Sequence, residues 1–219
     1  MYVGLKMLKR KDFVTVTPET LVAEAEKLLL KNRLWMLLVE EDGHLVGCVT
    51  KEAVKEALPS RVTSLSKHEI NYLLCKLKVR EIYSPEVPSV RPETEIEEAA
   101  RLMYDNDWPG LAVTDQKRHL LGYINRSVML QVLVEEMGLL QGGSRIVFEV
   151  EERRGVIHEV SGIISGMSIS IISTATFYHD SRRMVVLRVA TPDPGEIIKA
   201  LEGRGYAMVG PETFAAEWS

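Results

Sequence analysis

The sequence predicts an α/β protein that contains a duplicated unit and then a smaller α+β domain. Residues 13–39 return 74 positions later, with ten identities over 27 residues. Each copy has the pattern strand, helix, strand, strand, helix. After Gly142-Gly143 the pattern changes to strand, helix, strand, strand, helix, strand. Because repeats of this length bury their apolar faces on each other, two copies favour a closed pair with pseudo-twofold symmetry.

Composition excludes several classes of protein. The 219 residues carry a formal net charge of −4, which argues against a nucleic-acid partner. The uncharged run from 160 to 178 is long enough to span a bilayer, but it holds five serines, two threonines and Gly166. We therefore expect it to fold as a helix end, a turn and a buried strand, in a cytoplasmic protein without a membrane partner.

In the first copy, apolar runs alternate with turn residues. Asp42-Gly43 is a strong hairpin signal between two apolar runs. Thr20 and Thr50 are expected to cap the two helices, and Thr94, with Glu97, is expected to form a capping box in the second copy. Cys48 and Cys75 are interpreted as small core residues rather than as a metal pair or a disulfide.

The boundaries follow from these patterns. Residues 67–78 read as an extra amphipathic helix between the copies, either a packing strut or a partner-binding helix. The predicted organisation is a first repeat at 1–58, a linker with this helix at 59–78, a second repeat at 79–138, a Gly-rich linker at 139–144, a ferredoxin-like βαββαβ domain at 145–210 and a tail at 211–219.

The repeated motifs resemble a tandem CBS pair, or Bateman module. The resemblance is carried by the runs 13–20, 35–39 and 45–50 and by their second copies. The third unit resembles an ACT domain through residues 147–160 and 166–169. A CBS pair followed by one ACT domain is the layout of AcuB-type acetoin-utilization proteins, and the ordered combination of motifs covers almost the whole chain.

The resemblance implies a regulatory protein that holds an adenosine-containing ligand such as AMP, ATP or S-adenosylmethionine, with no required cofactor. Carried over by position, the nucleotide-binding candidates are Leu34, Trp35, Met36, Thr50, Lys51, Trp108, Pro109, Gly110, Asn125 and Arg126. ACT domains bind amino-acid-like effectors at dimer interfaces, and the candidates there are Gly155, Val156, Ile157, Ser168 and Ile169. The resemblance also implies a homodimer and a partner enzyme.

Two departures from the family pattern bear on binding. In nucleotide-binding CBS repeats, an aspartate three residues after the threonine holds the ribose hydroxyls. The corresponding positions here are Ala53 and Val128, neither of which accepts a hydrogen bond through its side chain. Losing such a contact removes roughly 1.5–3 kcal/mol per bond. The ACT-like unit has Arg154-Gly155 where a Pro-Gly is usual, and Ser168 where an asparagine is usual.

No catalytic motif is present in the sequence. The five histidines lack the spacing of a metal site, and no phosphate-binding glycine loop or nucleophile elbow occurs. We therefore expect a protein that is not an enzyme and needs no metal. Two functions stay open at this point: a small-molecule sensor, or a ligand-free dimer scaffold for a partner enzyme.

Overall fold

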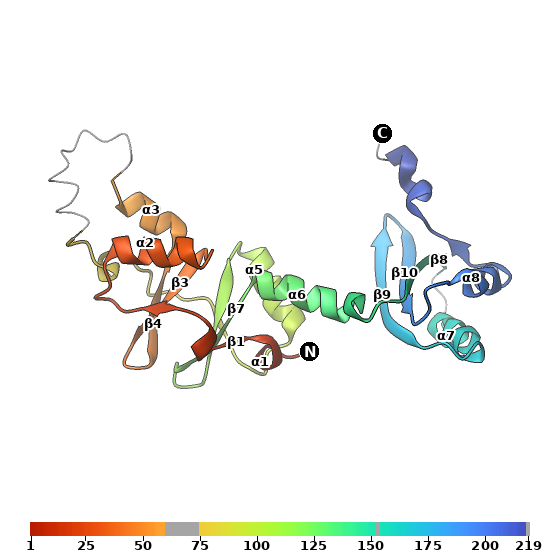
Figure 1. The fold of residues 1–219 in the computed structure, drawn as a ribbon, viewed down its shortest axis with the longest axis horizontal. Helices are drawn as coiled ribbons and strands as arrows, with labels where there is room; N and C mark the ends of the chain where they lie inside the picture. The colour runs from red at the N-terminus through yellow and green to blue at the C-terminus, as the bar shows by residue number, and fades with distance from the viewer. Residues whose placement is uncertain (60–74, 152–153, 218–219) are drawn as a thin grey trace. The chain divides into compact units, whose positions relative to one another are not determined.

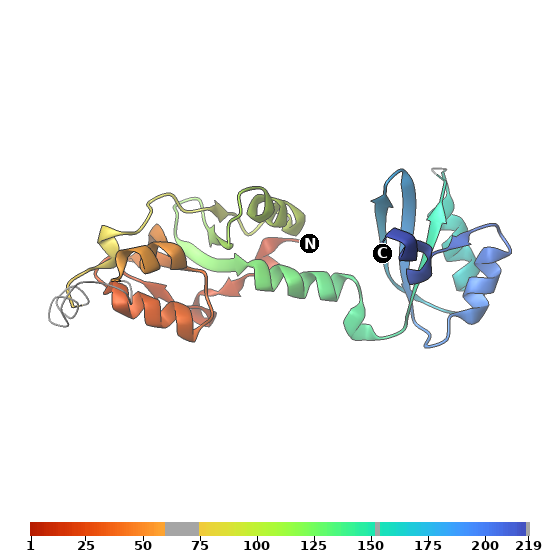
Figure 2. The same cartoon turned by 90° about the horizontal axis from the view of Figure 1, so that it is seen from above.

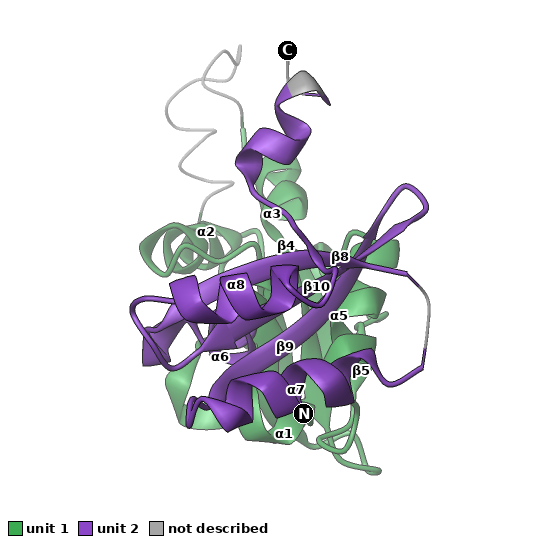
Figure 3. Ribbon diagram, turned by 90° about the vertical axis from the view of Figure 1, so that its right-hand side faces the viewer, with its two compact units in different colours: residues 1–130 green, residues 131–219 purple. Residues whose placement is uncertain are grey.

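A computed structural model describes residues 1–59, 75–151 and 154–217. The chain divides into two compact units, Met1–Leu130 and Gln131–Ser219 (Figure 3). The division falls inside one helix, α6 (Arg126–Glu136), ahead of the Gly-rich segment that the sequence suggests as a linker.

The first repeat has the predicted order of elements (Figure 1). Strand β2 pairs in parallel with β3, and β3 pairs antiparallel with β4 through the Asp42-Gly43 turn. Both turn residues have positive φ, 49° and 79°, as the Asp-Gly signal predicts. Helices α2 and α3 cover one face of this sheet and bury a core around Leu29, Leu37 and Val54. The elements are β2 (Thr15–Val16), α2 (Val22–Lys31), β3 (Met36–Glu41), β4 (His44–Thr50) and α3 (Lys51–Ala57).

The second repeat has the same order and the same sheet pairings. Strand β5 is parallel to β6, β6 is antiparallel to β7, and the N-terminal strand β1 extends the sheet in the order β1-β7-β6-β5. Pro88 lies just before the edge strand β5, as its missing donor predicts. The elements are β5 (Ser89–Val90), α5 (Ile96–Asp105), β6 (Gly110–Thr114), β7 (Leu120–Asn125) and α6.

The segment that precedes each repeat pairs with the other repeat. In the N-terminal segment, α1 (Val3–Lys6), β1 (Leu8–Lys9) and η1 (Arg10–Asp12) run alongside the second repeat, and the Val3 amide donates to the Thr94 carbonyl over 2.9 Å. The segment that carries η2 (Val79–Glu81) runs alongside the first repeat, and the Val79 amide donates to the Thr20 carbonyl over 2.8 Å. This crossing ties the two repeats together.

The repeats also share a hydrophobic core. Its buried members come from β3, β4, β6 and β7, and Leu8, Phe13 and Val87 pack against them. The hairpin turns of the two repeats meet at His44 and His119, whose rings lie 4.5 Å apart. The internal repeat predicts such a common core, because each copy buries its apolar face on the other. The buried members of this core are Met36, Leu38, Leu45, Cys48, Ala112, Leu120 and Tyr123.

The second unit has the predicted βαββαβ order, with the antiparallel sheet order β11-β8-β10-β9 of a ferredoxin-like fold. Helices α7 and α8 cover one face of this sheet (Figure 2). At the end of α6, the Met137 carbonyl accepts hydrogen bonds from Ser173 Oγ (2.8 Å) and Arg188 Nε (3.1 Å). The elements are η3 (Leu139–Gln141), β8 (Ser144–Val150), α7 (Val156–Gly166), β9 (Ile171–His179), β10 (Arg182–Val189), α8 (Gly195–Glu202), β11 (Ala207–Met208) and η4 (Pro211–Glu217).

Several local predictions were wrong. Helices α2 and α5 begin one residue later than expected, after Leu21 and Glu95, and neither of these residues gives a side-chain cap. The hydroxyl of Thr20 instead accepts from the Thr17 amide (3.0 Å), so no cap forms. In the second copy, Thr94 bonds the Arg91 amide in the same way (3.1 Å), so the predicted capping box does not form.

The amphipathic helix expected at 67–78 lies largely outside the described residues. Its last part is described and is not helical, because Cys75 and Lys76 form a turn and Lys78 pairs with Leu21. Cys75 is therefore exposed rather than a core residue, whereas Cys48 is buried as predicted. Among the described helices, none has both the length and the apolarity to cross a membrane.

Candidate functional site

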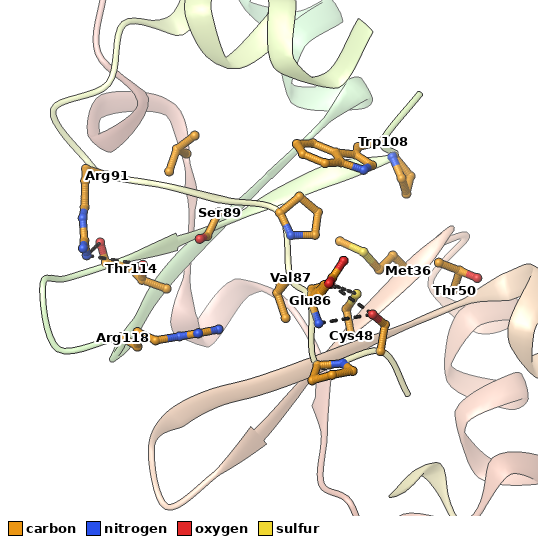
Figure 4. A pocket seen from close by; sticks show the side chains of 15 residues that line it. Met36, Cys48, Thr50, Glu86, Val87, Ser89, Arg91, Trp108, Thr114 and Arg118 are labelled. Atoms are coloured by element: carbon orange, nitrogen blue, oxygen red, sulfur yellow. Dashed lines mark hydrogen bonds between the residues drawn. The ribbon is translucent and has the colours of Figure 1, made fainter. Parts of the chain in front are cut away.

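A cavity of about 900 Å³ opens in the first unit, and both repeats contribute to its wall (Figure 4). Its size falls within the range of small-molecule sites. Figure 4 shows Met36, Thr50 and Trp108 toward one end and Arg91, Thr114 and Arg118 toward the other. The lining residues are Met36, Cys48, Thr50, Ser84, Pro85, Glu86, Val87, Pro88, Ser89, Val90, Arg91, Trp108, Pro109, Thr114 and Arg118.

The first end of the cavity is apolar and aromatic. Met36 begins β3, Cys48 lies on β4, and Trp108 and Pro109 precede β6. Burial raises the pKa of Cys48 to about 11, so the thiol stays neutral at physiological pH. Flat apolar surfaces of this kind suit a planar ring system.

The other end carries two arginines. Arg91 follows β5 and donates from Nη1 to the Thr114 carbonyl over 3.0 Å, which holds its guanidinium at the end of β6. Arg118 lies in the turn between β6 and β7, at a φ of 64°. Its carbonyl accepts from the Leu45 amide of the first repeat (3.2 Å). Two guanidinium groups at one end of a cavity favour an anionic group such as a phosphate.

The crossing segment ahead of the second repeat forms the wall between these ends. Ser84 pairs with Cys48 through two backbone hydrogen bonds of 2.9 and 2.8 Å. Ser84 Oγ and the Glu86 backbone also form a local turn, and Cys48 Sγ donates weakly to the Glu86 carbonyl (3.6 Å). Glu86 is the one acidic residue among the fifteen described residues that line the cavity.

The structure brings together four of the ten nucleotide-binding candidates: Met36, Thr50, Trp108 and Pro109. The remaining six do not line this cavity. Gly110 and Asn125 are the pseudo-twofold equivalents of Met36 and Thr50, with the same register in their hairpin. Leu34, by the same relation, is the equivalent of Trp108.

The basic candidates from the sequence point elsewhere. Lys51 places its ammonium 4.8 Å from the ring centre of Trp35, which is 59% exposed. Arg126 forms an ion pair with Asp107. Neither side chain is among those that line the cavity, whose positive charge comes from Arg91 and Arg118 instead.

The polar groups expected to face a ribose act as helix caps. Thr50 Oγ accepts from the Ala53 amide (3.2 Å), and Asn125 Oδ1 accepts from the Val128 amide (3.0 Å). The side chains of Ala53 and Val128 add no acceptor. Thr50 still faces the cavity, so its hydroxyl proton is available to a ligand while its oxygen caps α3.

The effector candidates of the second unit lie at opposite ends of α7. Gly155 precedes the helix with a φ of 86°, Val156 is buried in the core, and Ile157 is 42% exposed. Ser168 and Ile169 follow its C-terminus. Eleven helical residues separate the two groups by roughly 16 Å, so within one chain they do not form a single pocket.

Sequence reasoning missed Glu86, Arg91, Thr114 and Arg118 as lining residues. A signal was available in the repeat itself. Arg91 replaces Thr17 of the first copy, and Arg118 replaces Gly43, the residue just before the paired histidine. Charged residues that break an internal repeat mark the place where the two copies differ in their chemistry.

The comparisons with known proteins decide the family of the first unit. The model of the CBS domain matches residues 5–60 and 79–135, which together make up more than half of the chain. The chain belongs to the CBS-domain family. The cavity therefore lies in a CBS pair, and the crossing segments and the shared core are its internal seam.

Curated relatives match this CBS pair. A CBS domain-containing protein of Dictyostelium discoideum is 29% identical over 136 residues, 62% of this chain and 94% of the relative. CBSX1, a chloroplastic CBS domain-containing protein of Arabidopsis thaliana, is 27% identical over 61% of this chain and 64% of the relative. The magnesium transporter MgtE of Thermus thermophilus is 41% identical over 47% of this chain, but only 19% of that protein is covered.

Solved structures agree on the fold. CBSX2 in complex with AMP is 27% identical, with a TM-score of 0.51 over 61% of this chain and 96% of that one. A protein named AcuB, for acetoin utilization, from Vibrio cholerae is 18% identical, with a TM-score of 0.53 over 66% of this chain and 98% of that one. At this identity the second likeness supports the fold alone.

Proposed function

We propose that this chain is a regulatory sensor whose CBS pair binds an adenine nucleotide in the cavity between the repeats. The observation that carries the proposal is the chemistry of the two ends. The aromatic and apolar end, with Met36 and Trp108, suits the adenine ring, and the end with Arg91 and Arg118 suits the phosphate. The complex of CBSX2 with AMP makes AMP the first ligand to test.

Glu86 supplies what Ala53 and Val128 lack. A ribose offers hydroxyl donors, and a carboxylate that accepts both of them compensates for the absent aspartates. Glu86 lies between the apolar end and the basic end on the crossing segment, at the position that a ribose occupies between a base and a phosphate. We assign it that role in the proposed complex.

A sensor of this kind regulates by population shift. A ligand that contacts both repeats favours the arrangement in which the cavity is formed, because it binds that arrangement more tightly. The ligand would contact Met36 and Thr50 of the first repeat and Trp108 and Arg118 of the second. A partner enzyme or assembly would then respond to the selected arrangement, and the chain itself would carry out no reaction.

The second unit supports a further part of the proposal. Its βαββαβ order and its sheet order are ferredoxin-like, which is compatible with the proposed ACT domain, and Gly155 keeps a side-chain-free backbone at the start of α7. Since Gly155 and Ser168 lie at opposite ends of that helix, an amino-acid-like effector would need both ends from two copies of the chain. Light scattering with and without each amino acid tests this homodimer. Acetoin utilization rests only on the AcuB likeness, at an identity that supports no more than the fold.

A ligand-free dimer scaffold for a partner enzyme is the alternative, and Ala53 and Val128 favour it. The two functions differ in a thermal-shift screen of the full chain with AMP, ATP, S-adenosylmethionine and the amino acids. A ligand at 100 times its Kd stabilises a protein by about 2.7 kcal/mol through mass action. A rise in Tm with AMP supports the sensor. An unchanged Tm across the whole panel supports the scaffold.

A further inference from the structure

The two halves of the CBS pair are not equivalent as binding sites. The pseudo-twofold relation gives each residue of the cavity a counterpart in the other half. The register of the two hairpins shows which residues are equivalent. Leu38 faces Cys48 in the first repeat, and Ala112 faces Tyr123 in the second, so Cys48 corresponds to Tyr123. Both hairpins carry a bulge at the same place, so Glu40 of the first repeat corresponds to Thr114 of the second.

Aromatic rings fill the counterpart of the cavity. Phe13 stands in the place of Val87, and its ring centre lies 5.7 Å from that of Tyr123. Gly110 stands in the place of Met36, and a Cβ at Gly110 would overlap the Tyr123 hydroxyl. Tyr123 is 4% exposed, and burial raises its pKa, so the phenol stays neutral. The space that Gly110 leaves is therefore occupied by the ring of Tyr123.

The charge is also different. Thr114 lines the basic end of the cavity, whereas its counterpart is the carboxylate of Glu40, which is paired with Arg10 at 2.6 Å and accepts from Thr15 (3.2 Å). The counterpart of Arg118 is Gly43, because the backbone bonds match: Leu45 binds the Arg118 carbonyl, and Leu120 binds the Gly43 carbonyl. An anion at the counterpart position would meet a carboxylate and would lack a guanidinium from the turn.

We infer that one CBS pair holds one anionic ligand, in the cavity with Arg118, and that the counterpart formed by Phe13, Glu40, Gly110 and Tyr123 is closed to it. This inference rests on the proposed function. According to this inference, the turn residue determines which half binds the ligand. That residue is Arg118 in the second repeat and Gly43 in the first. The position tolerates either residue, since both turns use a positive φ, 64° and 79°.

Calorimetric titration of the full chain with AMP tests the stoichiometry. The expected result is one AMP per chain, and two per chain would overturn the inference while leaving the proposed function intact. No binding would overturn the proposed function, and the inference with it. These outcomes are distinguishable in a single titration.

Two tryptophans report the location of the ligand. Trp108 lines the cavity, whereas Trp35 is the counterpart of Pro109 and belongs to the other half. In Trp35→Phe we expect AMP to change the fluorescence as in the unmodified chain, and in Trp108→Phe we expect the change to be lost, with the double variant as baseline. A response that persists in Trp108→Phe and disappears in Trp35→Phe would place the ligand in the other half and contradict the inference.

Arg118→Gly copies the turn residue of the first repeat and is compatible with the backbone. We expect it to weaken AMP binding at least tenfold, with a Tm in the absence of ligand that is unchanged or slightly higher. Glu40→Gln, which removes the carboxylate of the other half, should leave the affinity and the stoichiometry as they are. An unchanged affinity in Arg118→Gly would overturn the role of this residue even if one AMP still binds.

Discussion

The Arg118 carbonyl accepts a hydrogen bond from the Leu45 amide over 3.2 Å, so the turn that presents Arg118 is tied to the opposite repeat. The guanidinium at the basic end thus depends on how the two repeats are packed. The affinity of a ligand that binds this guanidinium therefore depends on the arrangement of both repeats, which is what a sensor requires.

The substitution Arg118→Gly separates binding from stability. Removing a charge-assisted contact should weaken AMP binding by roughly 1.5–3 kcal/mol, at least tenfold. The free energy of unfolding should stay the same or rise by about 1 kcal/mol, because glycine adopts a φ of 64° without strain. Titration and urea unfolding measure the two effects. Lys117→Ala, next to it in the turn, is the control and should change neither.

Glu86→Gln tests the ribose contact. In the unmodified chain we expect AMP to bind at least tenfold more tightly than 2′,3′-dideoxy-AMP, because the carboxylate accepts from the ribose hydroxyls. The variant should lose most of this preference, and Glu56→Gln, which is exposed and outside the cavity, should keep it. If the unmodified chain binds both nucleotides equally, Glu86 has no such role.

The two cysteines give a chemical probe of the cavity. In Cys75→Ser, the remaining Cys48 should react slowly with a thiol reagent at pH 8, because burial raises its pKa from 9.0 to about 11 and only the thiolate reacts. AMP should slow the reaction further. Since the folded-state pKa is the higher one, the stability that Cys48 contributes is present below pH 9 and is lost as the pH rises toward 11. Labelling of native Cys48 at the rate of the unfolded chain would contradict its placement.

Gly47 tests the crossing of the entry segments. A Cβ there would overlap the Tyr83 ring and lie 2.8 Å from the Ser84 carbonyl, so Gly47→Ala should destabilise the first unit by about 1–3 kcal/mol. Gly162 in α7 has open space around it, and Gly162→Ala should stabilise its helix by up to about 1 kcal/mol. Urea unfolding compares the two variants. Equal effects would mean that the crossing segment does not pack on Gly47.

The order of elements could be predicted because it depends on local patterns. The Asp42-Gly43 turn, the apolar strands and the helical stripes can each be identified from neighbouring residues alone. The internal repeat shows the same patterns a second time. The caps at Thr20 and Thr94 failed for a local reason as well: each hydroxyl bonds the amide three residues earlier, a competing use that threonine often makes of its side chain.

The candidate site could be predicted only in part. Met36, Thr50, Trp108 and Pro109 follow from the position of the family motifs. Glu86 reaches the cavity only because its segment crosses to the other repeat, a tertiary pairing that no local pattern encodes. The family motifs predict Lys51 and Arg126 as ligand contacts, but Lys51 lies over the Trp35 ring and Arg126 pairs with Asp107.

A crystal structure of the full chain grown with AMP would test the central claim most directly. The account predicts one nucleotide per CBS pair, with the adenine between Met36 and Trp108, the ribose hydroxyls on Glu86 and the phosphate on Arg118. AMP bound instead beside Glu40 and Tyr123, or a cavity without nucleotide at saturating AMP, would contradict it.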